Sequence, residues 1–505
     1  MKKSIVPCFL ISLACSAVSF AAEKNIIFFI TDDQSPTLGC YGDPIAKTPA
    51  IDAVAEDGTL FQNAFATTAS CSASRSVVLS GLHNHANGQY GHQHSFHKFS
   101  SYENVSSLSL PRAMAKAGYR TGHIGKYHVA PERVFPFETY LKGNQRNAVH
   151  MAEQSRKFIT KNSDKPFFLY FATSDPHRGG GKDNSSKQRL KPDLFGNKPN
   201  RKSHDEVDEI FYQPQDLPIP SFLPDTIKTR EELAHYYQSV SRIDQGLARL
   251  IEILKEAELY DKTLLVFTSD HGMAFAGGKT TVYEGGLKVP FVVRNPYENK
   301  RGIKHKSLIS HIDITPSLLD FAGALDHKKN RPTLWVEKQN EKKIKSGVPK
   351  DNLGNIHKLA RYHGKSWLSI LGDPAKNHWN EIFASHTFHE IQMYYPMRVI
   401  RDEQYKLIWN IAHPLPYPFA SDLWAASSFQ AQYQKSMSAP YGQKTVRDYI
   451  HRPEFEFYKI DQDPHESNNL ASSSKHAAIL NTYKEKLKSA QSKFHDPWIM
   501  KWNYE

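Results

Sequence analysis

Cysteine is scarce in this sequence, with four residues among 505. Cys8 and Cys15 fall within the first 22 residues, which have the pattern of a removable leader, so the mature chain is expected to keep Cys40 and Cys71. This count is compatible with a single disulfide between Cys40 and Cys71. It excludes a disulfide-rich scaffold, because such small secreted domains carry many cysteines.

Long hydrophobic runs are also rare. The main one extends from Ile5 to Val18, follows two lysines and is followed by a small-x-small cleavage pattern that ends at Ala21. This arrangement predicts a secretory signal peptide over residues 1–22 and a periplasmic or secreted protein. No later stretch approaches the roughly 18 apolar residues that cross a bilayer, so we expect no membrane span.

The composition shows no strong bias. Hydrophobic residues make up 39% and charged residues 23%, which argues against disorder, collagen-like repeats and coiled coils. Lysine and arginine total 64 against 52 acidic residues, a formal charge of +12. This mild excess suits an anionic ligand without naming it, and we expect no nucleic-acid partner.

Three apolar runs of strand length are each followed by polar residues. They cover residues 25–30, 166–171 and 263–267 and are followed by Asp32-Asp33, Asp175-Pro176-His177 and Asp270-His271. Such runs are typical of strands buried on both faces of a parallel sheet. Ligands bind at the carboxyl ends of strands in these sheets, so the edge is the expected functional site.

Helical patterns separate the runs and complete an α/β fold. The clearest covers residues 231–257, and another covers 110–117. We therefore predict a large, mostly parallel sheet sandwiched by helices over residues 23–374. After that the pattern becomes a hairpin over 397–411, a strand over 455–460 and a helix over 472–494, which predicts a smaller α+β domain with an antiparallel sheet over 375–505.

Cys71 and Arg75 stand four residues apart at the predicted start of a helix. Residues at this spacing share one helix face, and a helix N-terminus favours negative charge. The pair therefore indicates an anion site with a nucleophile. For an arbitrary pair at this spacing, a buried cysteine beside a surface arginine would be the ordinary explanation.

Asp32 and Asp33, together with Asp270 and His271, are expected to converge where two parallel strands end. An Asp-Asp pair after a strand alone is more often a helix cap, but the second strand ending in Asp-His favours a divalent cation site. Oxygen-rich sites suit Ca²⁺ or Mg²⁺, and the imidazole leaves Mn²⁺ open.

With these companions, the Cys71-x-Ala73-x-Arg75 motif resembles the signature of the sulfatase family in the alkaline phosphatase superfamily. The resemblance extends from about residue 25 to residue 498. It implies an alkaline-phosphatase-like fold and conversion of Cys71 to formylglycine by a maturation enzyme. The hydrated aldehyde would be the nucleophile beside a metal site to which Cys71 also belongs.

The same resemblance implies roles for the other charged groups. Arg75, Lys126 and Lys279 would neutralise charge around sulfur. His177 and Lys279 would serve the leaving group, and His128 would assist loss of the proton that expels sulfate. A lone histidine among 25 is usually structural or solvated, and the local frames Gly-Lys-Tyr-His and Asp-Pro-His distinguish these two.

Within the family, several further motifs resemble the sulfamidases, which act on N-sulfoglucosamine in glycosaminoglycan degradation. These motifs cover residues 83–91, 131–136, 174–178, 237–246 and 386–398. They imply an exo-acting enzyme on a sulfated oligosaccharide, with sugar contacts from Glu390 and Arg398, although a Glu–Arg pair bracing the hairpin is equally compatible. The segment that contains His94 and His97 is most simply interpreted as a solvent-exposed loop. The predicted substrate-binding residues are His92, Arg178, His386, Glu390 and Arg398.

Some positions depart from that pattern. Ala73 replaces the commoner proline, His271 replaces asparagine, and Tyr283-Glu284-Gly285-Gly286 follows the general sulfatase sequence. An O-sulfatase acting on a marine or algal polysaccharide of ulvan or carrageenan type therefore stays an alternative. A phosphate or phosphonate ester hydrolase, a catalytically silent glycan-binding protein and assembly as a homodimer are left open as well.

Overall fold

The computed structural model describes residues 24–94, 97–179, 192–334 and 361–503. The predicted signal peptide lies outside these residues. Within the described part of the chain, no helix is both long and apolar enough to cross a bilayer.

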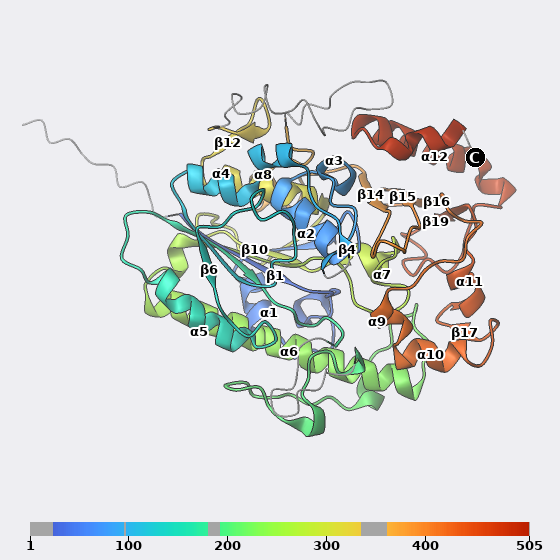
Figure 1. Ribbon diagram of the computed structural model, residues 1–505, viewed down its shortest axis with the longest axis horizontal. Coiled ribbons are helices and arrows are strands. Elements are labelled where there is room, and N and C mark those ends of the chain that lie inside the picture. The colour runs from blue at the N-terminus through green and yellow to red at the C-terminus, as the bar shows by residue number, and fades with distance from the viewer. Residues whose placement is uncertain (1–23, 95–96, 180–191, 335–360, 504–505) are drawn as a thin grey trace, which may run out of the picture.

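A large sheet forms the centre of the molecule, with strand order β11-β2-β10-β8-β1-β7-β5-β6 and β9 paired to β2 (Figure 1). Every pairing is parallel except those made by β10 and β9, so the predicted mostly parallel sheet is confirmed. Its strands are β1 (Asn25–Thr31), β2 (Thr59–Phe65), β5 (Arg120–Gly125), β6 (Thr139–Leu141), β7 (Phe167–Ala172), β8 (Thr263–Ser269), β9 (Lys288–Val289), β10 (Phe291–Arg294) and β11 (Ile303–Ser310).

Helices cover both faces of this sheet, as the apolar strands require. Ile27 and Phe29 of β1 pack in one core, and Ile26, Phe28 and Ile30 pack in the core on the opposite face. The first face carries α1 (Pro49–Glu56), α5 (Ala148–Ile159) and α6 (Ile227–Glu256), and the other carries α2 (Cys71–Ser80), α4 (Leu110–Lys116) and α8 (Ile314–Phe321) (Figure 1).

The predicted helices are present with small shifts at their ends. Helix α6 begins at Ile227, four residues before the predicted start, because the Thr226 side chain caps it by accepting from the Thr229 amide at 3.2 Å. Helix α4 ends one residue before the predicted end.

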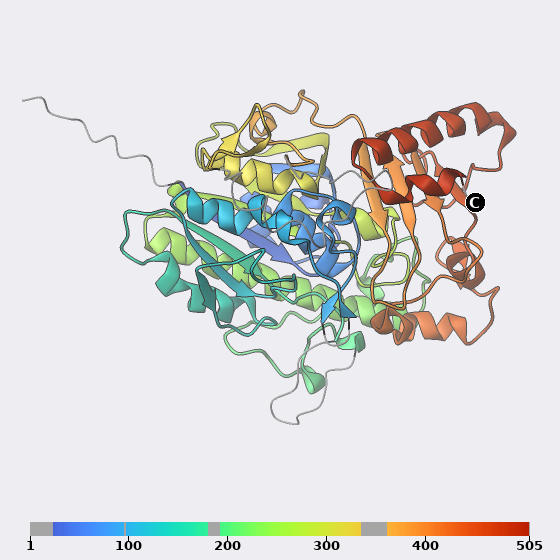
Figure 2. The same cartoon turned by 45° about the horizontal axis from the view of Figure 1, so that its top comes forward.

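The C-terminal region carries the predicted antiparallel sheet, in the order β14-β15-β16-β19 (Figure 2). The hairpin around Asp402 is present, and α12 (Ala477–Lys493) packs on one face, starting after a 3-10 turn over Ser474–His476. Residues on the other face join the core of the large sheet. These strands are β14 (Ile382–His386), β15 (Met397–Arg401), β16 (Lys406–Asn410) and β19 (Phe455–Tyr458).

Short elements complete the described residues. The helices are α3 (Asn84–Asn87), α7 (Glu284–Leu287), α9 (Ser421–Trp424), α10 (Ser427–Tyr433) and α11 (Val446–Ile450), and the strands are β3 (Gln93–His94), β4 (His97–Lys98), β12 (Leu325–Asp326), β13 (Arg331–Pro332), β17 (Pro440–Tyr441) and β18 (Lys444–Thr445).

Candidate active site

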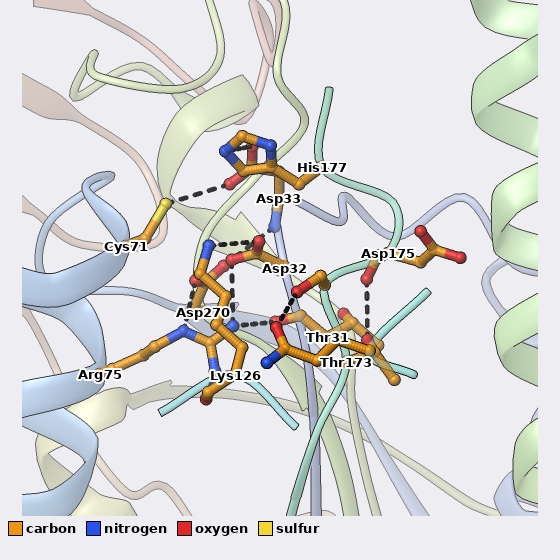
Figure 3. A network of polar contacts seen from close by, with 12 residues as sticks. Thr31, Asp32, Asp33, Cys71, Arg75, Lys126, Thr173, Asp175, His177 and Asp270 are labelled. Atoms are coloured by element: carbon orange, nitrogen blue, oxygen red, sulfur yellow. Dashed lines mark hydrogen bonds and ion pairs between the residues drawn. The ribbon is translucent and has the colours of Figure 1, made fainter. Parts of the chain in front are cut away.

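Polar residues from four adjacent strands meet at the carboxyl edge of the large sheet. Asp32 and Asp33 follow β1, Asp270 and His271 follow β8, and Lys126 follows β5. His177 lies beyond the end of β7 and points toward Asp33 (Figure 3). The apolar strands thus bring together groups that are far apart in the sequence, as the strand pattern predicts.

Arg75 is fully buried and bridges two carboxylates. Its Nε donates to Asp270 Oδ2 and its Nη2 to Asp32 Oδ1, each at 3.0 Å, while Lys126 Nζ pairs with the second oxygen of Asp32 (Figure 3). Arg75 and Cys71 both lie in the first turns of α2, and both side chains reach this cluster. The guanidinium fork suits two planar acceptors, which a lysine in its place would not serve equally.

Cys71, Asp33, Asp270 and His271 form a buried group whose ligand atoms all lie within 4.8 Å of one another. Cys71 Sγ lies 3.4 Å from His271 Nε2 and 3.5 Å from Asp33 Oδ1, and His271 Nε2 lies 3.1 Å from Asp33 Oδ1. His271 Nδ1 is 2.9 Å from the Gly272 carbonyl, which therefore accepts its proton and leaves Nε2 as the ligand atom. This donor set of carboxylate oxygens and one imidazole fits a divalent cation.

The backbone at this edge is itself constrained. Asp33 has a φ of 64°, a conformation that non-glycine residues rarely adopt, and its amide donates to Asp270 Oδ1 at 2.9 Å. The His271 amide donates to the same oxygen at 2.9 Å. Asp270 therefore fixes both neighbouring residues as well as contributing its own carboxylate.

The surrounding charges and burial give the carboxyl groups of the cluster different pKa values. Burial works against ionisation of Asp32, but Lys126 and Arg75 hold the pKa of this carboxyl well below its usual range. Burial and the neighbouring Asp32 raise the pKa of Asp270 to about 6. Burial also raises the pKa of the Cys71 thiol, which is therefore protonated and a poor nucleophile as an unmodified cysteine.

Lys279 connects the cluster to His177 and to the C-terminal region. Its Nζ lies 2.9 Å from Asp33 Oδ2, 2.8 Å from His177 Nε2 and 2.9 Å from Asp422 Oδ2. Burial and the adjacent Lys279 charge lower the pKa of His177 to about 4, so the proton of this pair resides on Lys279. Asp422 of α9 is absent from the sequence prediction, and no sequence motif marks it.

His128 and His92 lie beside each other, with ring centroids 4.9 Å apart. His128 has a φ of 52°, and its buried Nδ1 has no hydrogen-bond partner among the described residues. His92 Nε2 lies 2.7 Å from His389 Nε2, a contact that joins the segment before β3 to the C-terminal region. Of the predicted substrate-binding residues, His92 is thus brought close to a predicted catalytic group.

Both arginines predicted to bind substrate, Arg178 and Arg398, are engaged by protein groups. Arg178 has no exposed side-chain surface, pairs with Glu232 and Asp193, and packs against the rings of Phe195 and Phe275. Arg398 is equally buried and forms a bidentate pair with Asp496. These contacts fit bracing of the fold better than sugar binding, and the carboxylate partner of Arg398 is Asp496 rather than the Glu390 considered from the sequence.

The remaining predicted residues take different positions. His386 is buried at the end of β14, and burial lowers its pKa to about 3. Glu390 accepts a hydrogen bond from Gln392 at 2.8 Å.

Cys40 and Cys71 are free thiols in the structure, so the disulfide that the sequence allowed is not formed.

Asp175, which follows β7, supports the edge without facing the cluster (Figure 3). Its carbonyl accepts from the Asp32 amide at 3.1 Å, and its carboxylate pairs with Arg146 at 2.9 Å and Arg242 at 2.7 Å. The carboxylate is thus satisfied by two arginines. Asp175 is a structural support for Asp32.

Comparison with known proteins finds relatives that match almost the whole chain. The chain is 33% identical to human N-sulphoglucosamine sulphohydrolase over 95% of its length and 92% of that protein, and 29% identical to an ulvan-active sulfatase of Formosa agariphila over 94% and 79%. A solved structure in complex with its substrate D-glucosamine-2-N,6-O-disulfate superposes with a TM-score of 0.62 at 18% identity, covering 94% of this chain and 98% of that one.

The phosphonate monoester hydrolase of Agrobacterium radiobacter also shares the fold, with a TM-score of 0.61 at 18% identity over 93% of this chain and 96% of that one. These structures confirm the predicted alkaline-phosphatase-like architecture. The family model that matches the chain is Sulfatase, over residues 24–324. This chain therefore belongs to the sulfatase family.

Proposed function

We propose that this protein is a formylglycine-dependent, exo-acting sulfatase that removes the N-sulfate of glucosamine during glycosaminoglycan degradation. The observation that carries the chemistry is the buried group of Cys71, Asp33, Asp270 and His271, bordered by the cations Arg75, Lys126 and Lys279. The choice of substrate rests on the similarity to human N-sulphoglucosamine sulphohydrolase over almost the whole chain. The leader pattern supports action in the periplasm or outside the cell.

The cationic groups would bind and polarise the anionic substrate. Formylglycine made from Cys71 would supply a hydrated aldehyde as the nucleophile toward sulfur. A divalent cation, with Ca²⁺ as our first choice, would be held by Asp32, Asp33, Asp270 and His271 and would supply positive charge next to a sulfate oxygen. Fixed positive charge in a buried site stabilises developing negative charge more than the same groups do in water.

Proton transfer to the leaving nitrogen falls to Lys279 and His177. Lys279 Nζ donates to His177 Nε2 at 2.8 Å, and His177 Nδ1 lies 2.6 Å from the Arg178 carbonyl, so His177 is oriented at both ring nitrogens. The pair holds a proton that either group could present to the leaving atom. His128 would take up the proton that is lost when sulfate is expelled, and its unpartnered Nδ1 supports this role.

Replacing Cys71 tests the nucleophile. In a host that forms formylglycine only from cysteine, Cys71→Ser should fold normally and lose turnover, and mass spectrometry should find the aldehyde in the wild-type peptide. Because the substitution changes one atom, we expect no change in the melting temperature, and this measurement is the control for folding. Full activity in Cys71→Ser would refute the assignment.

An O-sulfatase is the second candidate, because the ulvan-active sulfatase of Formosa agariphila is similar over 94% of this chain. A panel of glucosamine N-sulfate, glucosamine 6-sulfate and ulvan or carrageenan oligosaccharides separates the two. We expect the highest kcat/KM on a terminal glucosamine N-sulfate. Preference for an O-sulfate would overturn the proposed substrate. Release of sulfate from internal units would overturn the proposed exo-action. Either result would leave the sulfatase assignment intact.

A further inference from the structure

Three imidazoles gather beside the carboxylate cluster, outside the metal-binding group described above. The ligand atoms of His92, His94 and His128 all lie within 4.8 Å of one another. Ring centroids are 4.7 Å apart for His92 and His94, 4.9 Å for His92 and His128, and 5.9 Å for His94 and His128. His94 lies in β3 and His128 follows β5, so the fold brings the group together from two separate segments.

The donors of this group differ in kind from those of the first site. Ca²⁺ and Mg²⁺ select oxygen ligands, whereas imidazole nitrogen suits Zn²⁺, Cu²⁺ and Ni²⁺. Three imidazoles with a fourth position open to solvent are a known arrangement for Zn²⁺. We propose that His92, His94 and His128 form a second metal site, which binds Zn²⁺ and is separate from the cation site of Asp33 and Asp270.

Neighbouring residues hold the ligands in place. His389 Nε2 lies 2.7 Å from His92 Nε2, and the Ser70 hydroxyl lies 3.0 Å from His389 Nδ1, so His92 is oriented by a chain of polar contacts. Hydrogen bonding to the second nitrogen of a ligand imidazole is the usual support of a metal site. With Nε2 engaged by His389, His92 would offer Nδ1 to the metal in place of the 3.5 Å contact that this nitrogen makes with the Ser72 hydroxyl.

The state of His128 also favours a ligand role. Its Nδ1 is buried without a hydrogen-bond partner among the described residues, which is costly unless something else satisfies it. Burial lowers the pKa of both His92 and His128 well below the usual value, so that both rings are neutral and able to ligate at pH 7. Two cations, Lys126 and Arg75, act on His128, and both are themselves paired with Asp32.

Occupation of this site should inhibit the enzyme. A Zn²⁺ ion bound to His128 would withdraw that imidazole from proton transfer and place a positive ion beside the carboxylate cluster. This consequence rests on the proposed function, whereas metal binding itself does not. Zinc would therefore act as an inhibitor that does not compete with Ca²⁺.

His94 allows the site to be tested without changing the residues given catalytic or substrate-binding roles. The full-length mature protein, saturated with Ca²⁺, is titrated with Zn²⁺ by calorimetry, and Co²⁺ is used as a spectroscopic probe for tetrahedral nitrogen ligation. We expect one Zn²⁺ per chain and a visible Co²⁺ band. His94→Gln should weaken Zn²⁺ binding by at least about 100-fold, because loss of an outer-shell partner alone costs about 10–100-fold. Turnover without zinc should be unchanged, and the control His413→Gln should match the wild type.

Asp33→Asn distinguishes the two metal sites. This variant should lose Ca²⁺ binding and activity but keep the zinc isotherm, because its carboxylate is not a ligand of the imidazole group. An unchanged Zn²⁺ affinity in His94→Gln would overturn the proposal, as would loss of the zinc isotherm in Asp33→Asn. Zinc binding without inhibition would retain the site and contradict the role of His128, which separates the two hypotheses.

Discussion

The ammonium of Lys279 lies 2.9 Å from the carboxylate of Asp422 and 2.9 Å from that of Asp33. Asp33 belongs to the sheet edge, whereas Asp422 belongs to α9, in the C-terminal region. A single lysine thus joins the two parts of the protein within the candidate active site. The C-terminal region therefore contributes a charged residue to the site.

Asp422→Asn should reduce kcat/KM by about 100-fold, the scale at which positioned acid–base groups act. Burial disfavours the charged form of Lys279, but Asp33 and Asp422 raise its pKa well above the usual value. Removing one carboxylate lowers this pKa, so the basic limb of the pH–rate profile should move to lower pH. Steady-state kinetics across pH checks both effects.

The exposed carboxylate of Asp461 provides a control for this change. Asp461→Asn should leave both the rate and the pH profile unchanged. A drop in rate in Asp422→Asn with an unaltered pH profile would indicate that Asp422 supports the structure of α9 and does not tune Lys279.

Arg75→Lys should abolish activity and destabilise the protein by about 3 kcal/mol, because breaking a buried ion pair leaves an uncompensated charge. The guanidinium reaches Asp32 and Asp270 at once, and a single ammonium cannot serve both. Urea denaturation measures the free energy of unfolding. Stability equal to that of the wild type would show that the two carboxylates do not depend on this bridge.

The core of the site was predictable because strand patterns fix where side chains meet. Asp32, Asp33, Asp270 and His271 each directly follow a buried parallel strand, and the carboxyl ends of adjacent parallel strands lie at one edge. Cys71 and Arg75 required only the helical spacing of α2. These positions follow from local sequence and the topology of one sheet.

Residues whose roles depend on packing between distant segments could not be assigned in this way. Arg178 pairs with Glu232, 54 residues away, and Arg398 with Asp496, 98 residues away. The sequence motifs around these two arginines predict sugar contacts, but a local motif does not show whether its arginine side chain is buried. Asp422 lies in a four-residue helix, and what places it in the site is its contact with Lys279, 143 residues away in the sequence.

Calcium should raise the melting temperature of the wild type, because a ligand that binds only the folded state stabilises it. At 100 times the dissociation constant the gain is about 2.7 kcal/mol. Asp270→Asn should lose this calcium-dependent gain, whereas Asp205→Asn, an exposed control, should keep it. Thermal unfolding with and without a chelator measures the shift, and an equal gain in Asp270→Asn would place the cation elsewhere.

The buried Arg398–Asp496 pair predicts a specific pH dependence of stability. Burial opposes ionisation of Asp496, but Arg398 outweighs it and lowers the pKa of this carboxyl from 3.8 to about 2. A folded-state pKa below the unfolded value stabilises the folded state at pH values above the unfolded pKa. This contribution is lost progressively as the pH falls from about 5 to about 1, through the folded-state pKa. The shift corresponds to about 2.5 kcal/mol.

Asp496→Asn isolates this contribution from those of other carboxylates. At pH 7 the variant should be less stable than the wild type by about 3 kcal/mol, because Arg398 stays buried without its anion. The difference in free energy of unfolding between the two proteins should shrink by about 2 kcal/mol between pH 5 and pH 2, since only the wild type loses the ionised carboxylate. Urea titrations at several pH values measure this difference. If the difference stays constant across this range, the pair does not shift the pKa of Asp496, and the bracing of the C-terminal sheet must come from apolar packing of α12 instead.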